Sequence, residues 1–390
     1  MISKKQIALS ALVAAMLAFT GCGSSDGGSD ETPTSNTDGN TNTDTPTDNT
    51  GTDTPTDNTD TETPTLNSAL FSGDSAATLE AKFNAQSDVV YPALAKETIA
   101  NTISTDTTLT NDKIWIIDGL VTVQNGATLT IEPGTVVAGK YGTADNSSYM
   151  VIAPGAKIMA DGTADAPIIF TSEKAVDGEA PAVGQWGGLT LVGNAGNDQT
   201  NAYEVNEDFV AGTSDMADNS GVLRHVKILN SGITMAEDKE INGLSFVGVG
   251  SGTVVENITV DLSDDDGVEL WGGTVNLSNI TISRCTDDHF DFDDGYSGLV
   301  TNLVINNTMG NAGIEMSGNT AATIDGFNIT MTDTAKEGGI FFKGSGIGGT
   351  LKNGTITYMV PDNGYGAIHS NDLNIDADNT SFENVSIIVE

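Results

Sequence analysis

The sequence predicts an all-β protein folded as a parallel β-helix, a solenoid in which the chain winds into stacked coils. The first observation is a motif that recurs over residues 254–390, for example as VVENITVDLSDDDGVELWGG and then VNLSNITISRCTDDHFDFDDG. Its copies are 22, 23, 24, 27 and 31 residues apart, measured between Asn257, Asn279, Asn302, Gly326, Asn353 and Asn384. Periods of this size are typical of solenoids.

The second observation is alternation within each copy. Two short runs alternate apolar and polar residues, as at 258–260 and 268–270, and Asn, Asp, Gly or Ser separate them. Alternation with a period of two indicates strands, and polar clusters indicate turns. Third, no copy contains an apolar stripe long enough for a helix, which disfavours a leucine-rich repeat. Each copy is therefore interpreted as one coil.

Strands are expected from residue 113 onward, so the β-helix domain is assigned to residues 113–390. The earlier strands are predicted at 114–117, 120–123, 126–137, 150–152, 157–159 and 168–170, with one further coil at 185–194. Residues 196–221 are polar and acidic and are expected to form a surface loop. Residues 67–112 are assigned to an N-terminal cap region, in which AATLEAKFNA at 76–85 predicts a short capping helix. Such a cap would protect the unpaired edge of the first coil.

The N-terminus has the pattern of a secretory signal. Lys4 and Lys5 precede an apolar run over 7–19, and LAFTGC at 17–22 resembles the lipobox of bacterial lipoproteins. That resemblance implies cleavage after residue 21, lipidation of Cys22 and a membrane anchor; the alternative is an ordinary signal peptide with a chance cysteine. Because Gly23 is not Asp, we expect the bacterial outer membrane, with the domain exposed at the surface or held in the periplasm.

Residues 22–66 predict a disordered, acidic Thr/Asp/Pro tether, because the segment is polar and repeats DTPTDNT at 44–50 and 53–59. Lipidation of Cys22 would leave Cys285 alone, so no disulfide is expected in the mature domain and Cys285 is expected to pack inside a coil. The formal net charge of −39 argues against nucleic acid as a partner.

Three segments carry a resemblance to a known family. GATLTIEPGTVV at 126–137, GQWGG at 184–188 and the pair DDGVELWGG and DDHFDFDDG resemble bacterial secreted lipoproteins with right-handed parallel β-helices. The resemblance covers about residues 113–390 and implies a right-handed β-helix. It implies little about activity, since this fold carries lyases, hydrolases, tailspikes and adhesins.

Carboxylates recur at equivalent positions of successive coils. Alternation places Phe290 and Phe292 inward and His289, Asp291 and Asp293 outward, and Glu269, Asp291 and Glu315 should form a column with a spacing of about 4.8 Å. Carboxylates this close repel one another. Calcium would relieve the repulsion, as would proton sharing or solvent screening. The candidate Ca²⁺ ligands are Asp265, Asp266, Glu269, Asp287, Asp288, Asp291, Asp293, Asp294 and Glu315.

An enzymatic interpretation rests on a resemblance to polygalacturonases. Residues 264–269 resemble their first catalytic segment, Asp287 and Asp288 their second, and GIFFK at 339–343 their last, whereas GNAG at 310–313 lacks the expected His. The resemblance implies Asp266, Asp287, Asp288 and Lys343 as catalytic residues of a polysaccharide hydrolase. Lys343 and Arg284 are the candidate bases of a lyase.

Two tryptophans followed by Gly-Gly are candidate sugar-stacking residues. Alternation places Trp271 outward beside Glu269, where it would either stack on a sugar or fold over the adjacent coil; the same alternatives hold for Trp186. The sequence thus predicts a lipid-anchored, calcium-stabilised, non-catalytic β-helix protein of the cell envelope that binds glycans or mediates adhesion. A polysaccharide-degrading enzyme and a purely structural envelope component are the alternatives.

Overall fold

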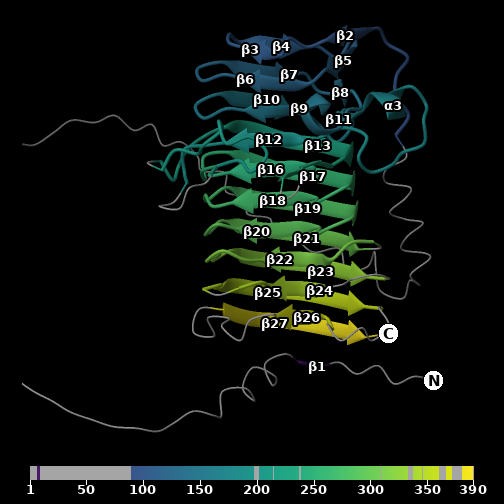
Figure 1. Cartoon of the computed structure of the whole chain (residues 1–390). Helices are drawn as coiled ribbons and strands as arrows, with labels where there is room; N and C mark the ends of the chain where they lie inside the picture. Colours follow the sequence, from purple (N-terminus) through teal and green to yellow (C-terminus); the bar gives the residue numbers. More distant parts are fainter. Residues whose placement is uncertain are drawn as a thin grey trace, which may run out of the picture.

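The chain folds into a tall stack of coils, seen in a computed structural model (Figure 1). The structure describes residues 7–8, 89–196, 202–213, 215–236, 239–307, 309–332, 337–344, 346–359, 366–370 and 380–389. The cap helix expected at 76–85, the tether and Cys22 lie outside the described residues. Among the described residues, no helix is both long and apolar enough to cross a membrane.

Two sheets form the walls of the stack, and their strands run parallel from coil to coil. The larger sheet holds, within the described residues, β1 (Ile7–Ala8), β2 (Lys96–Thr98), β4 (Thr107–Leu109), β5 (Ile114–Ile117), β7 (Thr128–Ile131), β8 (Val136–Gly139), β10 (Lys157–Asp161), β11 (Ile168–Ser172), β13 (Gly221–Ser231), β17 (Val254–Ser263), β19 (Asn276–Cys285), β21 (Leu299–Asn307), β23 (Thr323–Met331), β25 (Gly349–Tyr358) and β27 (Thr380–Val389). The short β1 is the exception, since it pairs antiparallel with β27.

The smaller sheet carries the face on which the acidic residues gather. It holds β3 (Thr102–Ile103), β6 (Leu120–Val123), β9 (Tyr149–Ile152), β12 (Leu189–Val192), β16 (Leu244–Val247), β18 (Val268–Trp271), β20 (Phe290–Asp293), β22 (Ala312–Met316), β24 (Gly338–Phe342) and β26 (Ile368–Ser370). Its strands pair in that order, so each coil contributes one strand to the face.

The long strands of the larger sheet share a bend at one equivalent position in successive coils. Asn257, Asn279 and Asn302 have φ values of 57°, 56° and 54°, and the equivalent Gly326 has a φ of 82°. Asparagine and glycine tolerate this left-handed conformation better than other residues. Each repeated asparagine therefore marks the same bend of the chain in its coil. The prediction that one sequence repeat forms one coil is confirmed.

The interior of the stack is a single apolar core. In the central coils Phe246, Leu270, Phe292 and Met316 stand in register, one above another, and all are fully buried. Cys285 is also buried in this core, as predicted. The inward positions of alternating strands thus supply one continuous column of side chains.

Parallel pairing begins earlier than expected. β2 pairs with β5, and β3 pairs with β6, so coils are present from Lys96 onward. The boundary predicted at residue 113 is therefore too late. The short strands β2 to β4 contain few apolar residues, and only their pairing with the next coil identifies them.

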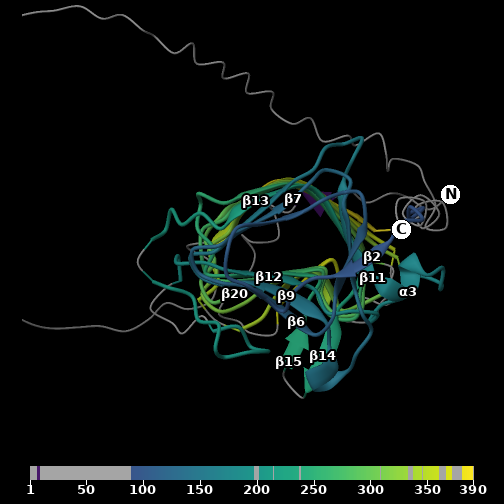
Figure 2. The ribbon, with the colours of Figure 1, turned by 90° about the horizontal axis from the view of Figure 1, so that it is seen from above.

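Two segments leave the stack and fold against the smaller sheet. The antiparallel hairpin of β14 (Ile233–Ala236) and β15 (Lys239–Ile241) projects from the coils, as Figure 2 shows in the view along their axis. Residues 202–213 form a loop that returns to the sheet, with Tyr203 fully buried. A four-residue helix, α3 (Glu173–Val176), lies beside the larger sheet.

Candidate metal centre

The carboxylates of the smaller sheet form a column along its outer face. Ser245, Glu269, Asp291 and Glu315 stand in register across β16, β18, β20 and β22. The predicted alignment of the three carboxylates is therefore confirmed, and adjacent parallel strands lie about 4.8 Å apart. Phe341 and then His369 continue the column, and their rings stack at 5.4 Å.

A second column lies at the turn that leads into each of these strands. The side chain of Asn242 accepts a hydrogen bond from the backbone N–H of Asp266 (3.1 Å). Asp266 in turn accepts from the N–H of Asp288 (2.8 Å), and Asp288 accepts from the N–H of Ala312 (2.5 Å). One carboxylate oxygen of each aspartate therefore ties a coil to the next, which leaves the other oxygen to face the cleft.

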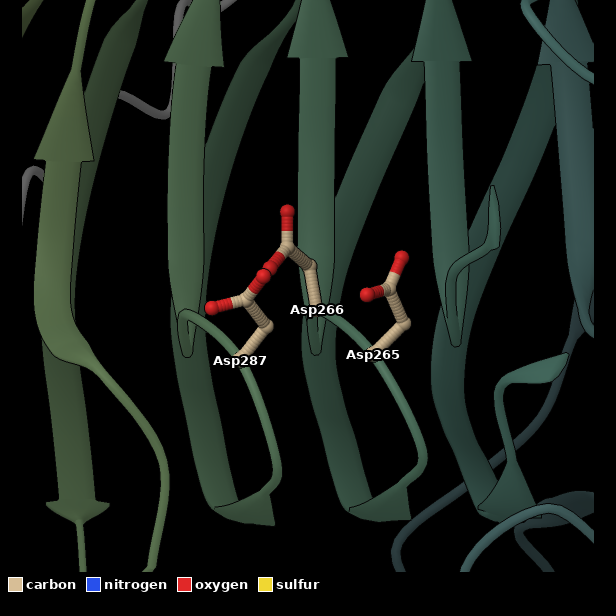
Figure 3. A group of neighbouring side chains, drawn as sticks. All are labelled: Asp265, Asp266 and Asp287. Carbon is tan, nitrogen blue, oxygen red and sulfur yellow. The ribbon is translucent and has the colours of Figure 1, made fainter. Parts of the chain in front are cut away.

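A third column precedes the second by one residue. Figure 3 shows Asp265 and Asp266 on one turn and Asp287 on the next, with the three carboxyl groups gathered together. One ligand oxygen from each lies within 4.8 Å of the others. Asp287 accepts a hydrogen bond from the side-chain amide of Asn311 on the following coil.

The loop and the hairpin turn these columns into a cleft of about 510 Å³. Glu204 from the loop and Thr234 and Glu240 from the hairpin line the cleft opposite the coils. The other lining residues are Asp264, Asp265, Asp266, Glu269, Thr286, Asp287, Asp288, Asn311, Asp291, Glu315 and Lys343. Of these described lining residues, ten are acidic and one, Lys343, is basic.

Burial sets the electrostatics of the cleft. Burial first, and then repulsion between neighbouring carboxylates, raises the pKa of Asp266, Glu269, Asp288 and Asp291 well above the usual range. The same causes raise the pKa of Asp265 to about 8. Ionisation of this cluster at neutral pH is therefore costly unless positive charge enters the cleft.

The remaining oxygen atoms suit a hard cation. Oδ1 of Asp291 and Oε2 of Glu315 have no hydrogen-bond partner among the described residues. Water cannot readily supply one, because the two residues are only 9% and 2% exposed. Unsatisfied buried acceptors are unfavourable. Calcium takes six to eight oxygen ligands, from carboxylates above all. The donor set of the cleft therefore fits Ca²⁺.

The basic residues singled out in the sequence have different surroundings. Lys343 reaches into the cleft, and its ammonium lies 2.8 Å from Oε1 of Glu315. Burial lowers the pKa of Lys343, but the bond to Glu315 and the nearby carboxylates outweigh it and hold that pKa above its usual value. Arg284 instead binds the buried Asp261 at 2.5 Å and is not among the residues that line the cleft.

One residue that was predicted to point outward, His289, is buried instead. His289 is fully buried, because it occupies a corner where the neighbouring coils have Gly267 and Gly313; its Nε2 accepts from the N–H of Cys285. Strand alternation does not extend to this corner. Asp293 and Asp294 lie beyond the lining of the cleft, and Asp293 accepts a hydrogen bond from the N–H of Asp294. Asp293 takes the outward position in register with Trp271, and the assignment of both residues as ligands stays a prediction.

The tryptophans do not offer exposed faces. Trp271 does point outward, but the loop covers it, leaving 6% exposed, and its ring meets Tyr203 edge-to-face at 6.0 Å. Trp186 lies in the core, where it stacks on Phe170 and donates its indole N–H to the carbonyl of Leu229. Neither is an accessible stacking platform in this structure.

The structure adds three acidic residues that sequence reasoning missed. Glu204 and Glu240 come from the loop and the hairpin, and Glu337 joins Asp288 and Glu315 in a group whose ligand oxygens lie within 4.8 Å. No repeat pattern marks the first two. Glu337 follows a longer stretch of sequence after its preceding strand than the equivalent residues of the earlier coils do, so its register is hidden in the sequence.

Comparison with known proteins gives distant structural similarities and a match to one family model. No curated protein matches the sequence. Among solved structures, tailspike protein 2 of Escherichia coli O157:H7 bacteriophage CAB120 is similar with a TM-score of 0.29 and 13% identity, over 63% of this chain and 31% of the tailspike. The catalytic unit of a thermostable GH87 α-1,3-glucanase from Streptomyces thermodiastaticus strain HF3-3 has a TM-score of 0.22 and 11% identity, over 71% and 64% of the two chains.

These structural similarities are distant, and the match to a family model is more direct. The model describes a pectate-lyase-like β-helix domain and matches residues 101–387. The match spans nearly all the coils and agrees with their parallel register. The predicted right-handed parallel β-helix is thus confirmed, and the chain belongs to the family of pectate-lyase-like β-helix domains.

Proposed function

We propose that this protein is a calcium-binding β-helix module of the bacterial cell envelope, held at the outer membrane through a lipid on Cys22. The observation that carries the proposal is the buried column of Glu269, Asp291 and Glu315, with an unpartnered oxygen on each of the last two. A bound Ca²⁺ would remove the repulsion among these groups and satisfy those oxygens. The ion would therefore stabilise the central coils.

The role proposed for the module is non-catalytic binding of glycans or of another cell surface. Hydrogen bonds to backbone N–H groups of the next coil hold Asp266 and Asp288 in place. Two aspartates fixed in this way serve the coil stacking directly, which favours a structural role with a metal over proton transfer. A rigid stack with a cation-filled cleft would present an ordered surface at the end of the tether.

Calcium titration of the purified protein tests the cation. We expect heat of binding in calorimetry, and a higher Tm in CaCl₂ than in EDTA, since a ligand that binds only the folded state stabilises it by about 2.7 kcal/mol at a hundred times its Kd. Asp291→Asn should strongly weaken both effects. Asp325→Asn is the matched control, because Asp325 pairs with Lys352 outside the cleft. Absence of binding in the native protein would overturn the proposal.

Glycan binding needs a separate measurement. Immobilised acidic and neutral polysaccharides should retain the native protein in Ca²⁺ and release it in EDTA, and Asp291→Asn should not be retained under either condition. Equal retention in Ca²⁺ and in EDTA would show that glycan binding does not require the metal. No retention on any polysaccharide would favour the purely structural envelope component.

One observation favours a second function, polysaccharide cleavage. Asp266, Asp287, Asp288 and Lys343, the four residues implied by the resemblance to polygalacturonases, do line one cleft. A hydrolase would release reducing ends and a lyase would release unsaturated products that absorb in the ultraviolet. Asp287→Asn should abolish either activity, and Asp325→Asn should preserve it.

A further inference from the structure

The carboxylates of the cleft divide into two groups. Asp265, Asp266, Glu269, Asp287 and Asp291 form two overlapping triads that share Asp266, and they are here called the Asp266 cage. Asp288, Glu315 and Glu337 form a separate triad, here called the Glu315 cage. Within each triad, one ligand oxygen per residue lies within 4.8 Å of the others.

Each cage contains one buried oxygen that has no hydrogen-bond partner among the described residues. In the Asp266 cage it is Oδ1 of Asp291, and in the Glu315 cage it is Oε2 of Glu315. Both side chains are more than nine-tenths buried and line the cleft. A positive charge beside each of these two oxygens would therefore stabilise its own cage.

A lysine already places a positive charge in the Glu315 cage. The ammonium of Lys343 lies 2.8 Å from Oε1 of Glu315, while its side chain remains 58% exposed. Its backbone is fixed, because the N–H of Lys343 donates to the carbonyl of Met316 (2.9 Å). The flexible stem can therefore swing the ammonium out to solvent without disturbing the coil.

The Asp266 cage holds no comparable partner. Lys343 is the single basic residue among the described residues that line the cleft; it forms an ion pair with Glu315, and its charge also acts on Asp291 without an ion pair. A divalent cation entering the Asp266 cage meets oxygen ligands and has no ammonium to displace from an ion pair. One entering the Glu315 cage must compete with the ammonium.

We propose that Lys343 is a built-in counter-ion that occupies the Glu315 cage, so that the cleft takes one divalent cation tightly in the Asp266 cage and a second only by displacing Lys343. The proposal rests on the cation binding proposed above and specifies its stoichiometry and location. It also gives Lys343 a role opposite to that of a catalytic base, since removal of its charge should improve ligand binding.

Calorimetric Ca²⁺ titration of Lys343→Met tests this inference. The native protein should show one tight and one weak binding event. In Lys343→Met the weak event should tighten roughly tenfold, a change of about 1.4 kcal/mol, while the tight event stays in place. Lys352→Met is the matched control, because Lys352 pairs with Asp325 at 3.3 Å outside the cleft and should leave both events unchanged.

Two further variants assign the events to the cages. Asp291→Asn should remove the tight event, and Glu315→Gln in the Lys343→Met background should remove the tightened one. The inference is overturned if the native protein binds Ca²⁺ but Lys343→Met behaves like Lys352→Met. If neither the native protein nor Lys343→Met binds Ca²⁺, both the inference and the proposed cation binding are overturned.

Discussion

Single asparagines set the bends of the larger sheet. Asn279 is exposed and has a φ of 56°, and its side-chain oxygen accepts a hydrogen bond from the amide of Asn302 at 3.0 Å. Its neighbours in the repeat make the same bend. An L-residue without a short polar side chain is strained there by about 1–2 kcal/mol.

This strain predicts that Asn279→Ala lowers the free energy of unfolding by about 1–2 kcal/mol, whereas Asn279→Gly costs less because glycine accepts a positive φ. Both variants lose the bond to Asn302, so the difference between them isolates the backbone strain. Denaturant unfolding measures both. Equal losses in the two variants would show that the hydrogen bond, and not the backbone, determines the effect.

A single charge in the carboxylate column should oppose folding when no cation is bound. Glu269→Gln keeps the shape of the side chain and an oxygen to accept the hydrogen bond from Asn242. We expect this variant to be more stable than the native protein by roughly 1–3 kcal/mol in EDTA at pH 8, and to gain less stability from Ca²⁺. Thermal melts check both results. Glu179→Gln, at an exposed position, should change neither.

At the scale of elements, the loop over residues 202–213 covers an apolar patch on the outer face of the coils. Tyr203 and Ala211 from the loop pack with Val151, Val247 and Trp271 from the sheet. The next residue, Glu204, lines the cleft, and burial followed by repulsion from Glu240 raises its pKa to about 7. One short segment therefore covers the apolar patch and also forms one wall of the cleft.

Loss of Tyr203 should detach this loop. Tyr203→Ala removes the ring that covers Trp271, at a cost of about 3 kcal/mol if the loop stays in place. We expect a red shift of tryptophan emission and stronger quenching by acrylamide, because Trp271 becomes exposed while Trp186 stays in the core. Val210→Ala, in the same loop but 45% exposed, should leave the emission unchanged. An unaltered spectrum in Tyr203→Ala would mean that other contacts hold the loop.

At the scale of the whole molecule, the acidic cleft makes stability depend on pH. The pKa values of Asp265 and Glu204 in the folded protein, about 8 and about 7, exceed the ordinary values of 3.8 and 4.5. At a pH between these values, the two carboxyl groups keep their protons in the folded protein and have lost them in the unfolded chain. This contribution to stability is complete below about pH 4 and is lost as the pH rises to about 8.

We therefore expect the metal-free protein to melt at a lower temperature at pH 8 than at pH 5, by roughly 5 °C or more. Calcium should reduce the difference, because the cation replaces the protons. Melting curves in EDTA and in CaCl₂ across this range measure both effects. A Tm in EDTA that rises steadily from pH 5 to pH 8 would contradict the burial of these carboxylates.

The sequence alone determined the coil. The alternation of residues around Phe290 and Phe292 has a period of two, and the asparagine bends recur once per coil, so local patterns fix both the inward face and the register. The column of Glu269, Asp291 and Glu315 follows from the same register, because equivalent residues of stacked parallel strands must be neighbours. These features depend only on spacing along the chain.

Tertiary structure decided which outward residues are buried. The loop that brings Glu204 and Tyr203 to the coils has no repeat, and its contacts join residues far apart in the sequence. His289 turned inward because the adjacent coils leave space at Gly267 and Gly313, which is a property of the stack. The burial of an outward residue, and therefore the electrostatics of the cleft, depends on which segment folds over the sheet. The residue pattern within one coil carries no information about that segment.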